Sequence, residues 1–281
     1  FVWPLSGRAA IDVFYMSAVG FRDETRMLNI SSIQNQDDVL PEVLPLAYEF
    51  RYTLEDGNEI TFRKARRQGH NVSTWLPLGY GSAYELPVAV IVSDIIGSFT
   101  RVNGTIVVEP PDIDKAVNNV SDCISTINDL KGKDQINHAL DLLYAASDVL
   151  NYVFNRTTST DPIAVSAVAV RSSLISIASD LASNFVRDQA TAEMMLACSR
   201  SLSEQARTSL TAEDQTMLLN QLAVTSNRSA ELVGYASEVT AQFGIDTASN
   251  VIRSGVLETT QGRRRKQRLK SPELEPQSKN R

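Results

Sequence analysis

The stretch Ala47-Tyr-Glu-Phe-Arg-Tyr-Thr-Leu54 alternates in character with a period of two residues. Three aromatic residues fall on one side of it: Tyr48, Phe50 and Tyr52. This alternation predicts a strand with one buried face. Asp56-Gly57 is typical of a turn, and Glu59 to Arg63 continues with apolar residues at every second position. We therefore expect an antiparallel hairpin.

Further short strands are expected on both sides of this hairpin. Ala10 to Val19 is rich in β-branched and aromatic residues, and Pro87 to Ser93 is a short apolar run typical of a sandwich core. Asn103-Gly104 predicts a turn between strands at Ser98–Val102 and Thr105–Glu109. No helical pattern separates these strands, which disfavours parallel βαβ units. Residues 1–109 are thus predicted to form an antiparallel β-sandwich, of the immunoglobulin or fibronectin III kind.

From Pro110-Pro111 onward the apolar residues recur at spacings of three and four, which indicates amphipathic helices. N-cap residues are expected at Asp112, Asp134 and Asp161, and Thr211 to Asp214 has capping-box spacing. Residues 191–207 either continue the third helix or form a fourth, and the last helix is expected to end near residue 244. The fold class is therefore α+β, with a multi-helix layer at 110–245 after the sandwich.

The charge distribution separates the body of the chain from its end. The net charge is −6, but Gln261 to Arg281 holds eight Lys or Arg and two Asp or Glu. The acidic body disfavours nucleic-acid binding, which depends on neutralising phosphates. Residues 246–281 are predicted to form a disordered basic tail.

No apolar run is expected to cross a membrane, because the best candidate, Pro162 to Ala182, is interrupted by Arg171 and Asp180. The chain begins at Phe1, and we expect it to be a fragment of a longer protein.

Acceptor sequences for N-glycosylation favour a secretory compartment. The chain has 16 Asn and 48 Ser or Thr among 281 residues, which predicts about three Asn-x-Ser/Thr sites by chance. Six occur, at Asn29, Asn71, Asn103, Asn119, Asn155 and Asn227.

Cys123 and Cys198 have no CxxC spacing, so a metal or redox motif is not expected. In an oxidising compartment they could form a disulfide between helices. Alternatively, both are small apolar residues on core faces.

Catalytic, cofactor and metal sites are not predicted. His70 and His138 are the only histidines, each expected to be exposed or capping, and no nucleophile and base are paired. Asp37-Asp38 and Asp112/Asp114 are more simply turn and cap residues than calcium ligands. The chain also lacks the glycine-rich phosphate-binding and nucleophile-elbow motifs.

One basic run has three interpretations. Arg63, Lys64, Arg66 and Arg67 could bind a sulfated or acidic glycan. The run also contains Arg-x-x-Arg, which is typical of a processing site. The simplest alternative is a solvated limb of the hairpin.

The β half carries a set of motifs that resembles the receptor-for-egg-jelly (REJ) module of polycystin-like proteins. The matching phrases are Phe21-Arg-Asp-Glu24, Pro45-Leu-Ala-Tyr-Glu-Phe50, Leu76-Pro-Leu-Gly79 and Val88-Ala-Val-Ile-Val-Ser-Asp-Ile-Ile-Gly97. Asp134 to Leu143 and Ala145 to Asn151 resemble the helical part of the GAIN-type region that follows this module. Thr25 to Leu44 departs from the family as an insertion. The basic end departs too, and no His-Leu-Ser/Thr self-cleavage tripeptide occurs.

The resemblance implies a non-catalytic, extracellular segment of a membrane receptor linked to calcium channel signalling, mechanosensing or gamete recognition. Its partners would be an extracellular ligand (a glycan or a matrix protein) and a channel subunit. Membrane attachment would come from other parts of the parent protein. The alternative is an intracellular helical scaffold, for which Arg263 to Arg268 would be a nuclear-targeting type of signal.

Overall fold

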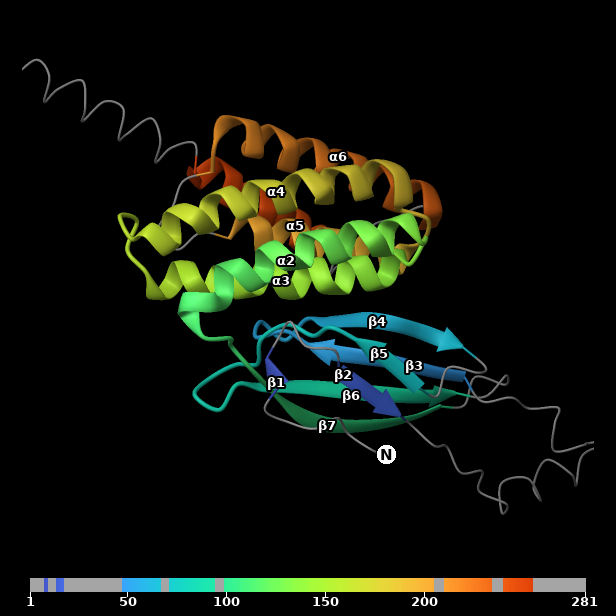
Figure 1. Ribbon diagram of the computed structural model, residues 1–281. Coiled ribbons are helices and arrows are strands. Elements are labelled where there is room, and N and C mark those ends of the chain that lie inside the picture. Colours follow the sequence, from blue (N-terminus) through green and yellow to red (C-terminus); the bar gives the residue numbers. More distant parts are fainter. Residues whose placement is uncertain are drawn as a thin grey trace, which may run out of the picture.

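The computed structural model describes residues 8–9, 14–17, 47–66, 71–93, 99–204, 210–233 and 240–254. Strands occupy the N-terminal side and helices follow, so the predicted α+β class is confirmed. Figure 1 shows the helices as a layer on one side of the strands, with α3 next to them and α6 farthest away.

The strands form two sheets. The larger has the order β1-β7-β6-β3-β4, and apart from the short parallel pair β1–β7 its strands are antiparallel. The smaller pairs β2 with β5 in antiparallel fashion. The strand bounds are β1 Arg8–Ala9, β2 Phe14–Ser17, β3 Ala47–Thr53, β4 Glu59–Arg66, β5 Asn71–Thr74, β6 Glu85–Ser93 and β7 Phe99–Glu109.

The aromatic face predicted for residues 47–54 is buried. Phe50 and Tyr52 are almost fully enclosed, and Tyr48 is half-buried. Tyr52 stacks on Phe62 of β4 with 5.6 Å between ring centroids. The predicted hairpin is confirmed, since β3 and β4 pair antiparallel around the turn that contains Gly57 at φ +86°.

The turn predicted at Asn103-Gly104 is wrong. Both residues lie inside the continuous strand β7, where Asn103 is opposite Ala89 and Gly104 is opposite Val88. β6 offers nine consecutive partners, so the ladder continues through the local turn signal. The exposed Asn103 side chain accepts a hydrogen bond from Nε of Arg101 at 2.7 Å.

Most of the helices begin at the capping residues that the sequence predicted. Asp112 and Asp161 each accept a hydrogen bond from the backbone two residues on, and Pro162 occupies the first turn of α4. Asp214 N–H donates to Thr211 Oγ1 at 3.1 Å, as expected for the capping box. The bounds are α2 Ile113–Gly132, α3 Ile136–Arg156, α4 Pro162–Phe185, α5 Gln189–Ser203 and α6 Ala212–Val233. The third predicted helix does not continue, because α5 starts anew with a capping box of Asp188 and Thr191.

The cap predicted at Asp134 is wrong. Asp134 has φ +55° and belongs to the tight link after α2, and the N-cap of α3 is Gln135, which makes no side-chain capping bond. The Gln135 N–H bonds instead to the Leu130 carbonyl at 2.9 Å. At this short link the backbone N–H groups therefore bond to the last carbonyl groups of α2, and α3 begins without a side-chain cap.

Helical structure extends beyond the predicted boundary at residue 245. Residues 240–254 are helical, and Phe243 and Val251 on this segment are buried. Part of the segment assigned to the tail thus has an apolar side that packs. Residues 255–281, with the basic run, lie outside the described residues, as do Phe21–Glu24, Asn29, Asp37-Asp38, Arg67 and His70.

Helix α4 is long and apolar enough to cross a membrane when judged by length and composition alone, contrary to our expectation. It packs by one face, with about a third of its apolar window buried. It lies against α2, α3, α5 and α6, and buried Arg171 on it stacks over the Phe154 ring at 4.7 Å. A buried arginine on a lipid-facing helix would be costly.

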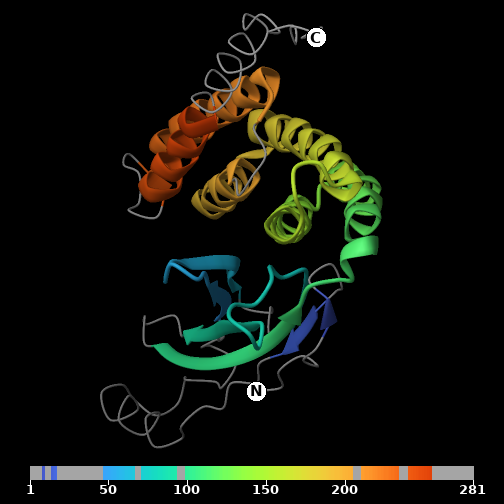
Figure 2. The same ribbon diagram turned by 90° about the vertical axis from the view of Figure 1, so that its left-hand side faces the viewer.

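One cluster of buried apolar side chains runs from the sheet into the helices. Figure 2 shows the helices curving over the sheet, and contacts join α5 to β4 and α3 to β5. Tyr52 stacks on Tyr144 of α3 at 6.3 Å and donates to the sulfur of Met194 on α5 at 3.8 Å. The sheet and the helical layer are therefore parts of one packed body.

We predict that Gly79→Ala destabilises the protein by about 3 kcal/mol or more, as expected for severe overpacking. A Cβ at this position would lie 1.7 Å from the Tyr84 carbonyl oxygen, and this backbone is held by a hydrogen bond from Gly79 N–H to Val108 O. Urea denaturation measures the free energy of unfolding.

Gly132→Ala is the matched control. A Cβ there meets nothing within 4 Å, and this helical position should be unchanged or stabilised by up to about 1 kcal/mol. Equal effects of the two substitutions would contradict the proposed steric origin.

Candidate functional site

A cavity of about 310 Å³ opens where the sheet meets the helical layer. The turn between β3 and β4 and the loop from Pro77 to Gly81 form one side. α3 and the end of α5 form the other. Its lining combines tyrosines, carboxylates and one arginine: Glu55, Asp56, Tyr80, Tyr84, Tyr144, Asp148, Asn151, Tyr152, Arg200, Ser201 and Glu204. A concave site at such a junction is the usual place for a ligand.

Asp148 of α3 ties the helices to the loop. Its Oδ2 accepts a hydrogen bond from the Leu78 N–H at 2.8 Å. Burial raises the pKa of Asp148 to about 7 although this hydrogen bond opposes the change, and nearby Glu204 and Glu55 raise it further. Near neutral pH, Asp148 therefore exchanges between its protonated and ionised forms.

Arg200 is the one cation among the described residues that line the cavity, and it is held by two carboxylates. It donates to Asp56 of the β3–β4 turn and pairs with Asp246 Oδ2 at 3.1 Å. Its guanidinium also lies over the Phe243 ring at 5.4 Å. Burial opposes ionisation of Asp56, but hydrogen bonds from Asn58 and Arg200 lower its pKa below the usual value.

The carboxyl of Glu204 lies at the exposed rim just after α5. Partial burial raises its pKa, against the attraction of Arg200, and Glu55 and Asp246 add to the increase. Glu55, Asp148 and Glu204 therefore place negative charge around the cavity that Arg200 does not neutralise.

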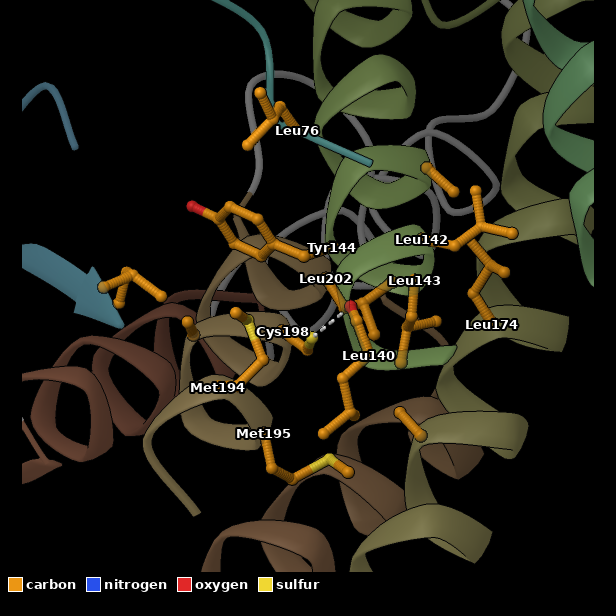
Figure 3. Packing of buried hydrophobic residues seen from close by; sticks show 14 of the residues in the cluster. Leu76, Leu140, Leu142, Leu143, Tyr144, Leu174, Met194, Met195, Cys198 and Leu202 are labelled. Carbon is orange, nitrogen blue, oxygen red and sulfur yellow. Dashed lines mark hydrogen bonds between the residues drawn. The ribbon is translucent and has the colours of Figure 1, made fainter. Parts of the chain in front are cut away.

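Tyrosine side chains form much of the wall. The Tyr80 hydroxyl donates to the Thr53 carbonyl, which closes the loop against β3. Tyr144 is only 8% exposed, and its hydroxyl forms no hydrogen bond within the part of the chain that the structure describes. Figure 3 shows this hydroxyl directed away from the leucines and Cys198 that pack around the ring. Tyr144 therefore offers a polar atom without a hydrogen-bond partner among the described residues, at the cavity and near Asp148 and Arg200.

A second polar contact across the junction lies outside the cavity lining. Thr74 of β5 donates its hydroxyl to Asp141 Oδ2 at 2.5 Å, and both residues are buried. Beside it, His138 is half-buried at the edge of the Trp75 ring, with 6.1 Å between centroids. His138 is thus half-buried and not exposed, because its helix face packs on the sheet.

In the structure both cysteine thiols are free, and an interhelical disulfide stays a prediction. Cys198 is buried and donates to the Leu140 carbonyl at 3.7 Å (Figure 3), and burial raises its pKa. Cys123 is half-buried on α2. The helix α3 packs on both α2 and α5.

The predicted glycosylation sites are spread over several elements. Asn103 on β7, Asn155 at the end of α3 and Asn227 on α6 are exposed, and Asn119 on α2 is half-buried. Asn71 begins β5. Asn155 also lines the cavity, so a glycan there would stand at its mouth.

The basic run lies on an edge of the larger sheet. Arg63, Lys64 and Arg66 belong to β4, the last strand in the sheet order. Within the described ranges, no three His, Cys, Asp or Glu residues converge as a metal site, and Asp112 is the cap of α2. Binding of an anionic glycan by this run stays a prediction.

The sequence patterns did not indicate which residues line the cavity. Asp56, Asp148 and Arg200 lie in segments far apart in the chain; Asp56 was predicted only as a turn residue, and the other two belong to no motif. The signal that could have indicated them is the Leu76-Pro-Leu-Gly79 loop, whose backbone N–H groups need acceptors.

Comparison with known families identifies a matching domain. The family model of the REJ domain matches residues 2–145, which is about half of the chain. The match includes the strands, α2 and the first part of α3. No curated protein matches, and no solved structure does.

We predict that stability falls as the pH rises through about 7, owing to Asp148. Its folded-state pKa lies above the unfolded value of 3.8, so the folded state holds the proton more tightly and loses this advantage once Asp148 ionises. Asp148→Asn retains an acceptor for Leu78. Near pH 8 it should be more stable than the wild type by about 2 kcal/mol, because one pKa unit corresponds to about 1.4 kcal/mol and solvent in the cavity screens part of the effect.

Urea denaturation at about pH 5 and pH 8 measures this difference. Asp122→Asn, on the exposed surface of α2, is the control and should follow the wild type. If the free energy of unfolding changed equally with pH in the wild type and in Asp148→Asn, the pH dependence could not be due to Asp148.

Proposed function

Because the chain belongs to the REJ domain family of polycystin-type receptors, we propose that it is a non-catalytic extracellular segment of such a receptor. In this role it holds other parts of the receptor at a fixed spacing and presents surface for ligand binding. Its parent protein would act in calcium channel signalling or mechanosensing, and other parts of that protein would provide membrane attachment and contact a channel subunit.

One observation carries this proposal: a single core joins the sheet to the helices. Residue 145, where the family match ends, lies inside α3, so the matched segment includes strands and helices together. A body of this kind resists bending at the junction, because bending would expose the Tyr52–Tyr144 contact and the buried Thr74–Asp141 hydrogen bond. Such stiffness suits a segment that transmits position or force.

Two further features support an extracellular ligand. Three acceptor asparagines are exposed on different elements, so glycans could be carried without displacing the core. The edge strand β4 carries part of the basic run, which suits an anionic glycan or a matrix protein. We propose in addition that α3 corresponds to the helical part of a GAIN-type region, because Asp134 to Leu143 and Ala145 to Asn151 resemble that segment.

The alternative is an intracellular helical scaffold, favoured by the basic run Arg263 to Arg268. In that case the glycosylation sequences would be accidental. The two proposals differ in whether the folded chain tolerates and carries N-glycans.

We predict that the chain, secreted from eukaryotic cells behind an added signal peptide, decreases in apparent mass on treatment with an N-glycosidase. Asn103→Gln and Asn155→Gln should each remove one glycan, because both asparagines are exposed. Asn118→Gln, exposed but outside any acceptor sequence, is the control. An unglycosylated or retained product would favour the intracellular alternative.

We also predict that the sheet and the helices unfold together. In a Trp3→Phe background, Trp75 fluorescence reports on the junction and far-ultraviolet circular dichroism reports on the helices. Both should give the same urea midpoint. Thr74→Val should lower both midpoints together, by about 1–3 kcal/mol in free energy, since it removes a buried hydrogen bond to a carboxylate.

Ser125→Ala is the control, because this exposed hydroxyl bonds only to the adjacent turn of its own helix. Two separate transitions would show that the junction is loose, and the proposed rigid spacer would then be untenable.

A further inference from the structure

The cavity at the sheet–helix junction has the chemistry of a small-cation site. Its volume, about 310 Å³, lies at the lower end of the range for small-molecule sites. We propose that it binds a primary alkylammonium group, either from a free amine or from a lysine side chain. The site would exist whether or not the chain is part of a receptor, because it rests on the lining residues alone.

Charge is the first argument. Four carboxylates and one guanidinium line the cavity. Arg200 is already paired with Asp56 and Asp246, so its charge is neutralised within the protein. Glu55, Asp148 and Glu204 remain. Burial is the main cause that raises the pKa of Asp148 and of Glu204, and neighbouring carboxylates raise both further, although Arg200 opposes this at Glu204. A cation placed among them would relieve this repulsion.

The free hydroxyl of Tyr144 is the second, independent argument. This side chain is more than nine-tenths buried and lines the cavity, and the described residues supply its hydroxyl with no hydrogen-bond partner. The hydroxyl oxygen is open to the cavity rather than enclosed, so a ligand atom there can hydrogen-bond to it.

Geometry favours an ammonium over a guanidinium. The acceptors come from separate elements: Glu55 from the β3–β4 turn, Asp148 from α3 and Glu204 from the end of α5. An ammonium can donate to one of these carboxylates and to the Tyr144 hydroxyl with separate N–H groups, whereas a guanidinium prefers two oxygens of one carboxylate. Asp148 already uses Oδ2 for the Leu78 N–H, which hinders bidentate pairing.

The apolar lining suits the alkyl chain of such a ligand. Leu54, Pro77 and Leu78 are buried and line the same cavity. Rings of Tyr80, Tyr84 and Tyr152 also line it, and aromatic faces attract cations. A metal ion is less suitable, because among the described residues no three acidic, histidine or cysteine side chains lie close enough to bind one together.

The test is an NMR titration of the full chain with n-butylammonium, observing the Leu78 backbone amide. This amide donates to Asp148 and therefore senses charge in the cavity. We expect a saturable shift with a Kd of about 1 mM, as a ligand of few atoms allows. Binding should tighten between about pH 6 and pH 8, as Asp148 ionises. n-Butanol, similar in shape but neutral, should bind at least about tenfold more weakly.

Variants localise the effect. Glu204→Gln and Tyr144→Phe should each weaken binding about 3- to 10-fold, since each removes one charge or one hydrogen-bonding atom. Glu213→Gln, an exposed carboxylate on α6 outside the cavity lining, is the matched control and should bind normally. Circular dichroism of each variant confirms that the fold is retained.

Equal binding of n-butanol, or equal weakening by Glu213→Gln, would overturn the proposal, as would a shift that does not saturate.

A second titration with a short peptide that contains one lysine separates the two sources of the amine. Peptide binding at similar strength indicates a protein partner, and binding of the free amine alone indicates a small molecule. Secretion and N-glycosylation should be unchanged in the cavity variants, so failure here is distinguishable from failure of the receptor proposal.

Discussion

The contact between the aromatic face of β3 and the helices α3 and α5 is the interaction on which the rest of the structure depends. Tyr52 lies at its centre, stacked between Phe62 and Tyr144 and bonded to the sulfur of Met194. Without this contact the apolar side of the hairpin would face water, and α3 would lose one of its packed sides. Full burial of an aromatic side chain contributes about 1.5–3 kcal/mol, so a cluster of such rings outweighs the polar groups enclosed beside it.

Polar groups collect at the margin of this contact, because loop and helix ends meet there and cannot all reach water. Among the described residues, the polar pairs that cross the junction at this margin include Thr74 with Asp141, Leu78 with Asp148, and Asp56 with Arg200. Each couples a backbone turn or strand end to a helix. The same convergence leaves the cavity between them, so the features that hold the two layers together also create the candidate binding site.

The boundary predicted at residue 110 marks a change of secondary structure. Buried contacts cross it, and the family match also crosses it, ending within α3. The change in hydrophobic period from two to three or four is a local property, whereas a folding unit is defined by shared burial. We therefore regard the strands together with the first helices as the smallest segment in which this core is complete.

Local chemistry by itself determined most of the elements: the alternation at residues 47–54, the caps Asp112 and Asp161, and the capping box at Thr211 depend only on neighbours within a few residues. Tertiary structure decided the rest. Nine consecutive partners on β6 carry β7 through Asn103-Gly104, and packing of Phe243 and Val251 extends the helices to residue 254. The cavity could not be predicted, since Asp56, Asp148 and Arg200 meet only after folding and no local pattern encodes contacts between residues so distant in the chain.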